Sequence, residues 1–144
     1  MNINQRGIDL IKEFEGFCAT PYKCPADVWT IGYGHTAGIN EHTVKITEEQ
    51  AEELLRRDVR TAENAVQQMV DVPLTDNQFS ALVSLVFNIG AANFARSTLL
   101  KKINAADYDG AAGQFERWAY AKGVKLAGLE RRRAAERELF EDEN

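Results

Sequence analysis

The sequence predicts one α+β domain, with a short helix first, then a small irregular β-region, then several helices. Three observations support this prediction: residues 4–15 have helical periodicity, residues 16–46 lack it, and helical signatures return between Thr47 and about residue 141. The length of 144 residues suits a single compact domain. A chain of this size buries roughly two thirds of its unfolded surface.

The first helix is expected to begin after Asn4, whose side chain can cap it. Ile8, Ile11 and then Glu15 follow helical steps of three and four. Glu15 therefore lies in line with the buried stripe, at the C-terminal end of this helix.

The region 16–46 is expected to form two or three short strands. Trp29, Ile31 and Tyr33 alternate as they would in a half-buried strand. Turn-forming residues punctuate the same region: Pro21, Pro25, Gly32, Gly34 and Gly38.

Two capping boxes open the next helices. Thr47-Glu-Glu-Gln50 begins a long helix to about Val70, and Thr75 caps a helix that stops at Gly90. The long helix carries an inner stripe: Ala51, Leu55, Asp58, Ala62, Ala65 and Met69. Further helices are expected near residues 94–105, 107–121 and 128–141. The expected lobes are roughly residues 12–58 and 59–144, with the first helix associated with the C-terminal lobe.

Composition and charge narrow the class of protein. Hydrophobic residues are 44% and charged residues 27%, which is ordinary for a globular protein. The net charge of −5 argues against a general nucleic-acid binder, because phosphate neutralisation needs a basic surface. The N-terminus lacks the apolar core of a signal peptide, and no window is apolar enough to span a bilayer. We therefore expect cytoplasmic residence, no stable membrane anchor and two free thiols.

One segment points to chemistry. Eight residues separate Glu15 from Cys24, five more separate Cys24 from Thr30, and the chain continues as Thr-Ile-Gly-Tyr-Gly-His-Thr. This order resembles the active-site segment of the phage-type lysozymes (T4-lysozyme-like endolysins, glycoside hydrolase family 24). Their pattern is Glu, eight residues, Asp or sometimes Cys, five residues, Thr. The resemblance covers nearly the whole chain, including Leu-Val-Phe-Asn-Ile-Gly at 85–90 and Gly-Leu-x-x-Arg-Arg-Arg-x-x-Glu at 128–136.

The resemblance implies a lysozyme-like fold and an endolysin of the muramidase type. Such an enzyme cleaves the β-1,4 bond between N-acetylmuramic acid and N-acetylglucosamine in bacterial peptidoglycan and lyses the host. It needs no cofactor and no metal. It would be a monomer that stays in the host cytoplasm until a holin lets it reach the cell wall.

The three motif residues receive different expected roles. Glu15 suits the general acid, because burial on an apolar stripe lets a carboxylic acid hold its proton near neutrality. Thr30 would bond the attacking water. Cys24 departs from the more familiar Asp, and it could direct that water or, as a thiolate, attack the sugar itself. Its thiolate would need a nearby cation, for which Lys23 and the run 131–133 are candidates.

Four further interpretations concern residues outside these three positions. Asp27 is an off-register substitute carboxylate. Phe87 and Asn88 resemble residues that line the saccharide cleft of the family, although simple core packing is an equal alternative for Phe87. Ser97 and Thr98 are weaker rim candidates. The run 131–133 is expected to be a partly solvated helix face, from which one member, Arg132 before the others, could reach Glu15.

Asp58 interrupts the apolar stripe of the long helix, and a charge on a buried face must be paired. We expect a structural ion pair with His35, which ends the hairpin segment.

Two rival functions remain at this point. One is a catalytically weakened peptidoglycan-binding protein that has lost activity because Cys24 replaces Asp. The other is a helical nucleic-acid-binding module that uses residues 117–133, where six cations accompany one acid, Glu130. The acidic total disfavours the second. The spacing of Cys18, Cys24, His35 and His42 matches no usual zinc pattern.

Overall fold

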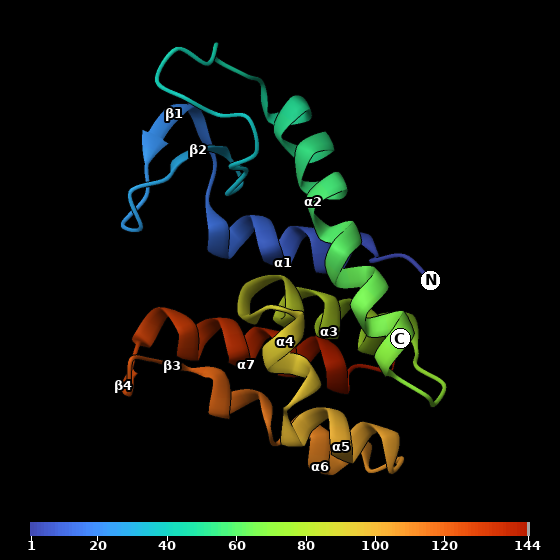
Figure 1. Ribbon diagram of the computed structural model, residues 1–144. Coiled ribbons are helices and arrows are strands. Elements are labelled where there is room, and N and C mark those ends of the chain that lie inside the picture. Colours follow the sequence, from blue (N-terminus) through green and yellow to red (C-terminus); the bar gives the residue numbers. More distant parts are fainter. Residues whose placement is uncertain (144) are drawn as a thin grey trace. The chain divides into compact units, whose positions relative to one another are not determined.

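The computed structural model describes residues 1–143, and it confirms the α+β class (Figure 1). Its elements are α1 (Gln5–Glu15), β1 (Cys18–Lys23), β2 (Trp29–Gly32), α2 (Glu48–Met69), α3 (Asp76–Ile89), α4 (Ala91–Ala95), α5 (Thr98–Asn104), α6 (Tyr108–Ala112), the 3-10 helix η1 (Phe115–Trp118), β3 (Tyr120–Ala121), β4 (Val124–Lys125) and α7 (Ala127–Glu141).

The described chain divides into two compact units. We call Ile11–Arg60 the hairpin unit, because it contains the β1–β2 hairpin. Met1–Leu10 together with the chain from Thr61 onward forms the helical unit. The chain passes from one unit to the other within α1 and within α2.

The hairpin unit contains the expected β-region. Strands β1 and β2 pair antiparallel, with Tyr22 opposite Thr30 and Lys23 opposite Trp29. The register shifts between Cys18 and Tyr22. Pro21 lies in this interval and has no N–H to offer a ladder. After β2 the chain turns back on itself through an isolated antiparallel bridge between Ile31 and His35.

All three expected helix caps are present. Asn4 Oδ1 accepts the Gly7 amide at 3.0 Å at the start of α1. Thr47 and Gln50 form a reciprocal box, with the Gln50 amide donating to Thr47 Oγ1 at 3.1 Å and the Thr47 amide donating to Gln50 Oε1 at 2.9 Å. Thr75 and Gln78 repeat this arrangement before α3. Polar side chains thus satisfy amide groups that the first turn leaves without intrahelical partners.

The helix predicted near 94–105 is instead two helices, α4 and α5. Ser97 lies between them with an extended backbone and caps α5. Its hydroxyl donates to the Phe94 carbonyl at 2.7 Å and accepts the Leu100 amide at 3.1 Å. A serine that bonds locally to the backbone competes with helix continuation, which explains the break.

The helix predicted at 107–121 was also wrong. The chain there forms α6, the 3-10 helix η1 and strand β3, which turns into β4. Lys122 and Gly123 both have left-handed backbone conformations, with φ of 51° and 78°, as a two-residue hairpin turn requires. Strands of two residues carry too little periodicity to be recognised. The helix predicted at 128–141 is confirmed as α7.

The core of the helical unit forms around α3. Nine residues of α3, from Asn77 to Val86, are buried, and α3 packs against α7. Figure 1 shows these two helices side by side. The 3-10 helix η1 also packs against α7. The shorter helices α5 and α6 pack on each other. This arrangement fixes the C-terminal end of α3, where Phe87 and Asn88 lie.

Candidate active site

Glu15 is the last residue of α1, and its side chain is half-buried. The turn after β2 approaches it closely at Gly34. A Cβ atom at Gly34 would lie 3.1 Å from Glu15 Oε1, and Gly34 has a left-handed φ of +83°. Glycine is the residue that tolerates both the conformation and the close approach. The hairpin therefore places backbone directly against the Glu15 carboxyl group.

Cys24 and Thr30 are brought together by one backbone carbonyl. The Val28 carbonyl accepts the Cys24 amide at 3.0 Å and the Thr30 hydroxyl at 2.9 Å. The loop from Cys24 to Val28 is closed by a turn in which the Asp27 amide donates to the Cys24 carbonyl at 2.8 Å. Thr30 is buried, whereas Cys24 is half-buried. The two candidate residues therefore lie close together, next to the loop that joins β1 to β2.

The local backbone makes the Cys24 thiol more acidic than usual. Hydrogen bonds from the Val28 amide, then the Ala26 amide, lower the pKa of the Cys24 thiol, and the Thr30 hydroxyl contributes in the same direction. Donors that face a sulfur stabilise its thiolate. Lys23 and the run 131–133 were the candidate cations for lowering this pKa. The groups that lower it are instead backbone N–H groups and the Thr30 hydroxyl.

Asp27 occupies the tip of the hairpin. It has a left-handed φ of 63°, and its side chain is 81% exposed. Its carboxylate lies 3.3 Å from Lys23 Nζ, and Lys23 also lies over the Trp29 ring. Among the described residues, the Asp27 carboxylate pairs with Lys23 and not with Thr30.

Tyr22 is a neighbour that the sequence did not single out. It pairs with Thr30 across the hairpin. Burial raises the pKa of the Tyr22 hydroxyl, and the nearby groups Cys18, Cys24 and Glu15 raise it further. The phenol therefore shares its surroundings with both candidate acid groups. The Pro-Tyr pair at 21–22 was the signal that could have indicated it.

The predicted contact between His35 and Asp58 is confirmed. His35 Nδ1 lies 2.8 Å from Asp58 Oδ2, and the two side chains are 13% and 28% exposed. The His35 backbone is bonded to Ile31 in both directions at 2.9 Å. A second tie joins α1 to α2 through Lys12 and Glu52. The Lys12 hydrogen bond lowers the pKa of the Glu52 carboxyl.

Phe87 and Asn88 lie in the last turns of α3 in the helical unit. Phe87 is half-buried, and Asn88 is exposed with its Oδ1 accepting a hydrogen bond from Arg133 Nη2 at 2.8 Å. Ser97 is buried and serves as a helix cap, which corrects its interpretation as a rim residue. Thr98 is exposed at the start of α5.

The expected solvated face at 131–133 was wrong for two of its three residues. Arg132 is 3% exposed and Arg133 is fully buried, whereas Arg131 is exposed. The buried arginines share Glu136, with Arg132 Nε 3.3 Å and Arg133 Nε 2.9 Å from its carboxylate oxygens. Ser84 Oγ also donates to Glu136 at 2.6 Å. Burial raises the pKa of Glu136 and lowers that of Arg133, while their mutual attraction opposes both shifts.

Comparison with known proteins places this arrangement in a family. Residues 12–136 match the family model described as phage lysozyme. The chain is 48% identical over 145 residues to an endolysin of Acyrthosiphon pisum secondary endosymbiont phage 1, covering 98% of this chain and 99% of that one. The chain belongs to the phage lysozyme family.

Other relatives agree with this assignment. The chain is 40% identical over 144 residues to the endolysin of Salmonella phage P22, covering 97% of this chain and 98% of that one. The solved muramidase domain of SpmX from Asticaccaulis excentricus superposes with a TM-score of 0.91 at 41% identity and covers 98% of each chain. The protein is therefore a glycoside hydrolase of the lysozyme type.

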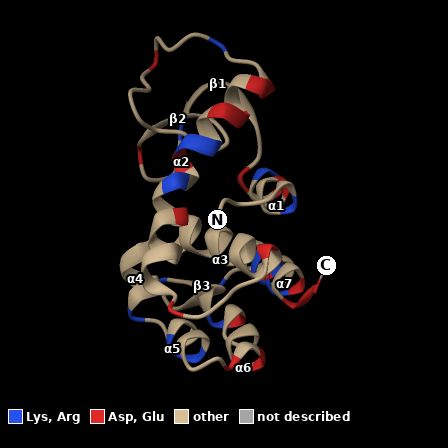
Figure 2. Cartoon of the chain, turned by 90° about the vertical axis from the view of Figure 1, so that its right-hand side faces the viewer, with Lys and Arg blue, Asp and Glu red and all other residues tan. Residues whose placement is uncertain are grey.

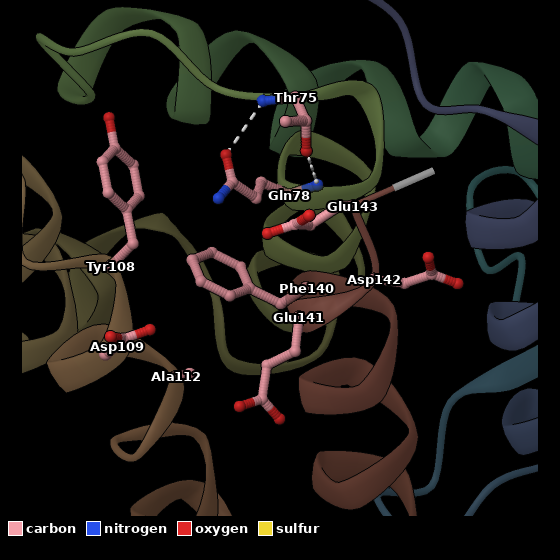
Figure 3. Close-up of a pocket in the computed structure, with 9 residues that line it drawn as sticks. All are labelled: Thr75, Gln78, Tyr108, Asp109, Ala112, Phe140, Glu141, Asp142 and Glu143. Carbon is pink, nitrogen blue, oxygen red and sulfur yellow. Dashed lines mark hydrogen bonds between the residues drawn. The ribbon is translucent and has the colours of Figure 1, made fainter.

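A separate pocket of about 350 Å³ lies in the helical unit of this enzyme (Figure 3). Tyr108 and Phe140 face it, together with the Thr75–Gln78 cap and several acidic side chains. Figure 2 shows acidic residues gathered at the C-terminal end of α7. None of the candidate site residues lines this pocket, so we do not assign the glycosidase chemistry to it. Among residues 1–143, no helix is both long and apolar enough to cross a membrane.

Proposed function

We propose that this phage-type lysozyme is an endolysin that hydrolyses the β-1,4 bond between N-acetylmuramic acid and N-acetylglucosamine. The strongest support is that the hairpin unit holds all three candidate residues. Its turn at Gly34 approaches the Glu15 carboxyl group, and one carbonyl at Val28 gathers Cys24 and Thr30. An acid, an acidified thiol and a hydroxyl are thus held on one small scaffold.

In the proposed reaction, Glu15 donates its proton to the glycosidic oxygen as the bond to the anomeric carbon breaks. A water molecule attacks the anomeric carbon from the opposite face. Thr30 holds that water, and the Cys24 thiolate accepts its proton. This route inverts the anomeric centre.

The acidified thiol also permits a second route. The Cys24 thiolate would attack the anomeric carbon and form a covalent glycosyl-enzyme, which water then hydrolyses with retention. We favour inversion, because the Thr30 hydroxyl beside Cys24 is suited to hold a water molecule. Anomeric proton NMR of the first product distinguishes the two routes.

Phe87 and Asn88 are proposed to bind the saccharide. An aromatic face suits the apolar side of a sugar ring, and an amide suits an N-acetyl group. We further propose that the enzyme acts as a monomer, stays in the host cytoplasm until lysis, and depends on a holin to reach the wall.

The turbidity of purified peptidoglycan tests the proposed acid. Glu15→Gln keeps the shape of the side chain but removes the proton donor, so lysis should fall by about 10²–10⁴-fold. Glu13→Gln, an exposed neighbour on α1, is the matched control and should lyse normally. Substantial turnover by Glu15→Gln would refute the assignment. A wild-type enzyme that binds the wall without lysing it would favour the weakened binding protein.

A further inference from the structure

The Asn88 carboxamide has a defined polarity. A guanidinium group carries donors and no acceptor, so the amide atom that faces Arg133 Nη2 at 2.8 Å must be the carbonyl oxygen. The amide N–H groups of Asn88 are then the part of this exposed side chain that a ligand can reach. The Asn88 side chain can therefore act as a hydrogen-bond donor toward a ligand.

Arg133 itself is rigidly held. Its side chain is fully buried, and its Nε lies 2.9 Å from Glu136 Oε1. Glu136 is also fully buried and is fixed from α3 by the Ser84 hydroxyl at 2.6 Å. A buried guanidinium between two packed helices cannot change rotamer freely. The orientation of Asn88 is therefore set by the core of the helical unit.

The buried cluster of Arg132, Arg133 and Glu136 is not well arranged to stabilise the fold. Arg133 Nε and Glu136 Oε1 lie 2.9 Å apart without the alignment of a hydrogen bond. Burying charges costs more than such geometry returns. Arg132 lies within 3.3 Å of Glu136, so the carboxylate keeps a cation even without Arg133. Arg133 provides the hydrogen bond to Asn88.

We propose that Arg133 is a positioning residue that presents the Asn88 amide as a donor to an acceptor oxygen of the saccharide. The acceptor is a sugar hydroxyl or the carbonyl of an N-acetyl group. This inference rests on the proposed saccharide-binding role of Asn88 and deepens it, because it fixes which half of the amide meets the substrate.

The first test reverses the polarity of the side chain. Asn88→Asp keeps an acceptor for Arg133 but removes both N–H donors. Binding of soluble glycan fragments of peptidoglycan is measured by calorimetry in a Glu15→Gln background. We expect the Kd to rise about tenfold while the Tm is kept. An unchanged Kd would show that Asn88 does not act as a donor and would overturn the proposal.

The second test asks whether Arg133 acts through Asn88. Arg133→Met should raise the Kd about fivefold when Asn88 is present, and should have no further effect beside Asn88→Ala. Equal losses in both backgrounds would make Arg133 merely structural and overturn the proposal. Arg137→Met is the matched control, because it removes a less buried cation, 34% exposed, from the same helix. Arg133→Gln, which retains an N–H donor, replaces Arg133→Met if that variant does not fold.

These measurements separate two kinds of failure. If the wild type releases no reducing sugar from peptidoglycan, the proposed function fails. If it lyses the wall normally while Asn88→Ala binds fragments as tightly as wild type, the positioning inference alone fails.

Discussion

The two units of the enzyme differ in how deeply their most buried charged side chains lie, although both also carry exposed ion pairs. The hairpin unit is tied by pairs that remain partly in contact with water, such as His35 with Asp58. The helical unit buries its charged cluster completely, at Arg133 and Glu136. Breaking an ion pair that is in contact with water costs little free energy, whereas breaking a buried ion pair costs several kcal/mol. We interpret the hairpin unit, which carries the candidate residues Glu15, Cys24 and Thr30, as the more adaptable of the two units.

The largest effect on stability is expected at Glu136. Glu136→Leu leaves the buried Arg132 and Arg133 without the carboxylate that both contact. The free energy of unfolding should therefore fall by about 3–5 kcal/mol. Urea denaturation followed by circular dichroism measures this change. A smaller loss for Glu136→Leu than for Asp58→Asn, which changes a partly exposed pair, would contradict this comparison.

A smaller and more local effect is expected at Gly34. Both Gly34 and Gly38 have left-handed backbones, with φ of +83° and +73°, but only Gly34 faces Glu15. Each change to Ala should cost about 1 kcal/mol of stability. Gly34→Ala should also reduce lysis about tenfold by displacing the Glu15 carboxyl group, since small misplacements at a reactive centre are costly. Equal lysis rates for the two variants would refute a role for this contact.

The smallest effect is expected at Asp58. Asp58→Asn removes the charge that faces His35 in a half-exposed pair, and should cost about 1 kcal/mol at neutral pH. Thermal unfolding at neutral pH measures the difference. Unchanged stability would mean that the pair, although formed, contributes nothing.

Local signals predicted much of this structure. The caps at Thr47 and Thr75 depend on residues three apart, and the hairpin segment depends on turn residues and alternation, so both could be read from the chain. The ion pair of Asp58 was predictable because a charge on an apolar stripe needs a partner. The β3–β4 hairpin was not, because its two-residue strands show no period.

The candidate site shows the same limit. The spacing of Glu15, Cys24 and Thr30 and the family resemblance were enough to select them as candidates. The amide groups that acidify Cys24 come from a backbone turn, and residue identities do not encode their direction. The burial of Arg132 and Arg133 depends on α3, which is distant in sequence, so the run of cations was interpreted as solvated.

The central claim is that the hairpin unit makes Cys24 a working second group beside Glu15. The most direct measurement is the pH dependence of lysis for wild type, Cys24→Ser and Cys24→Asp. Backbone hydrogen bonds, from the Val28 amide above all, lower the pKa of the Cys24 thiol, so thiolate forms as pH rises through a value below that of a free cysteine. The wild-type rate should rise over that range.

Cys24→Ser should be slow at every pH, and Cys24→Asp should stay active to lower pH, because an aspartate ionises at about pH 4. Thiol alkylation should slow the wild type as strongly as the serine change. An alkylated enzyme with a normal rate and pH profile, alongside an inactive Asp27→Asn variant, would contradict the account and move the second role to Asp27.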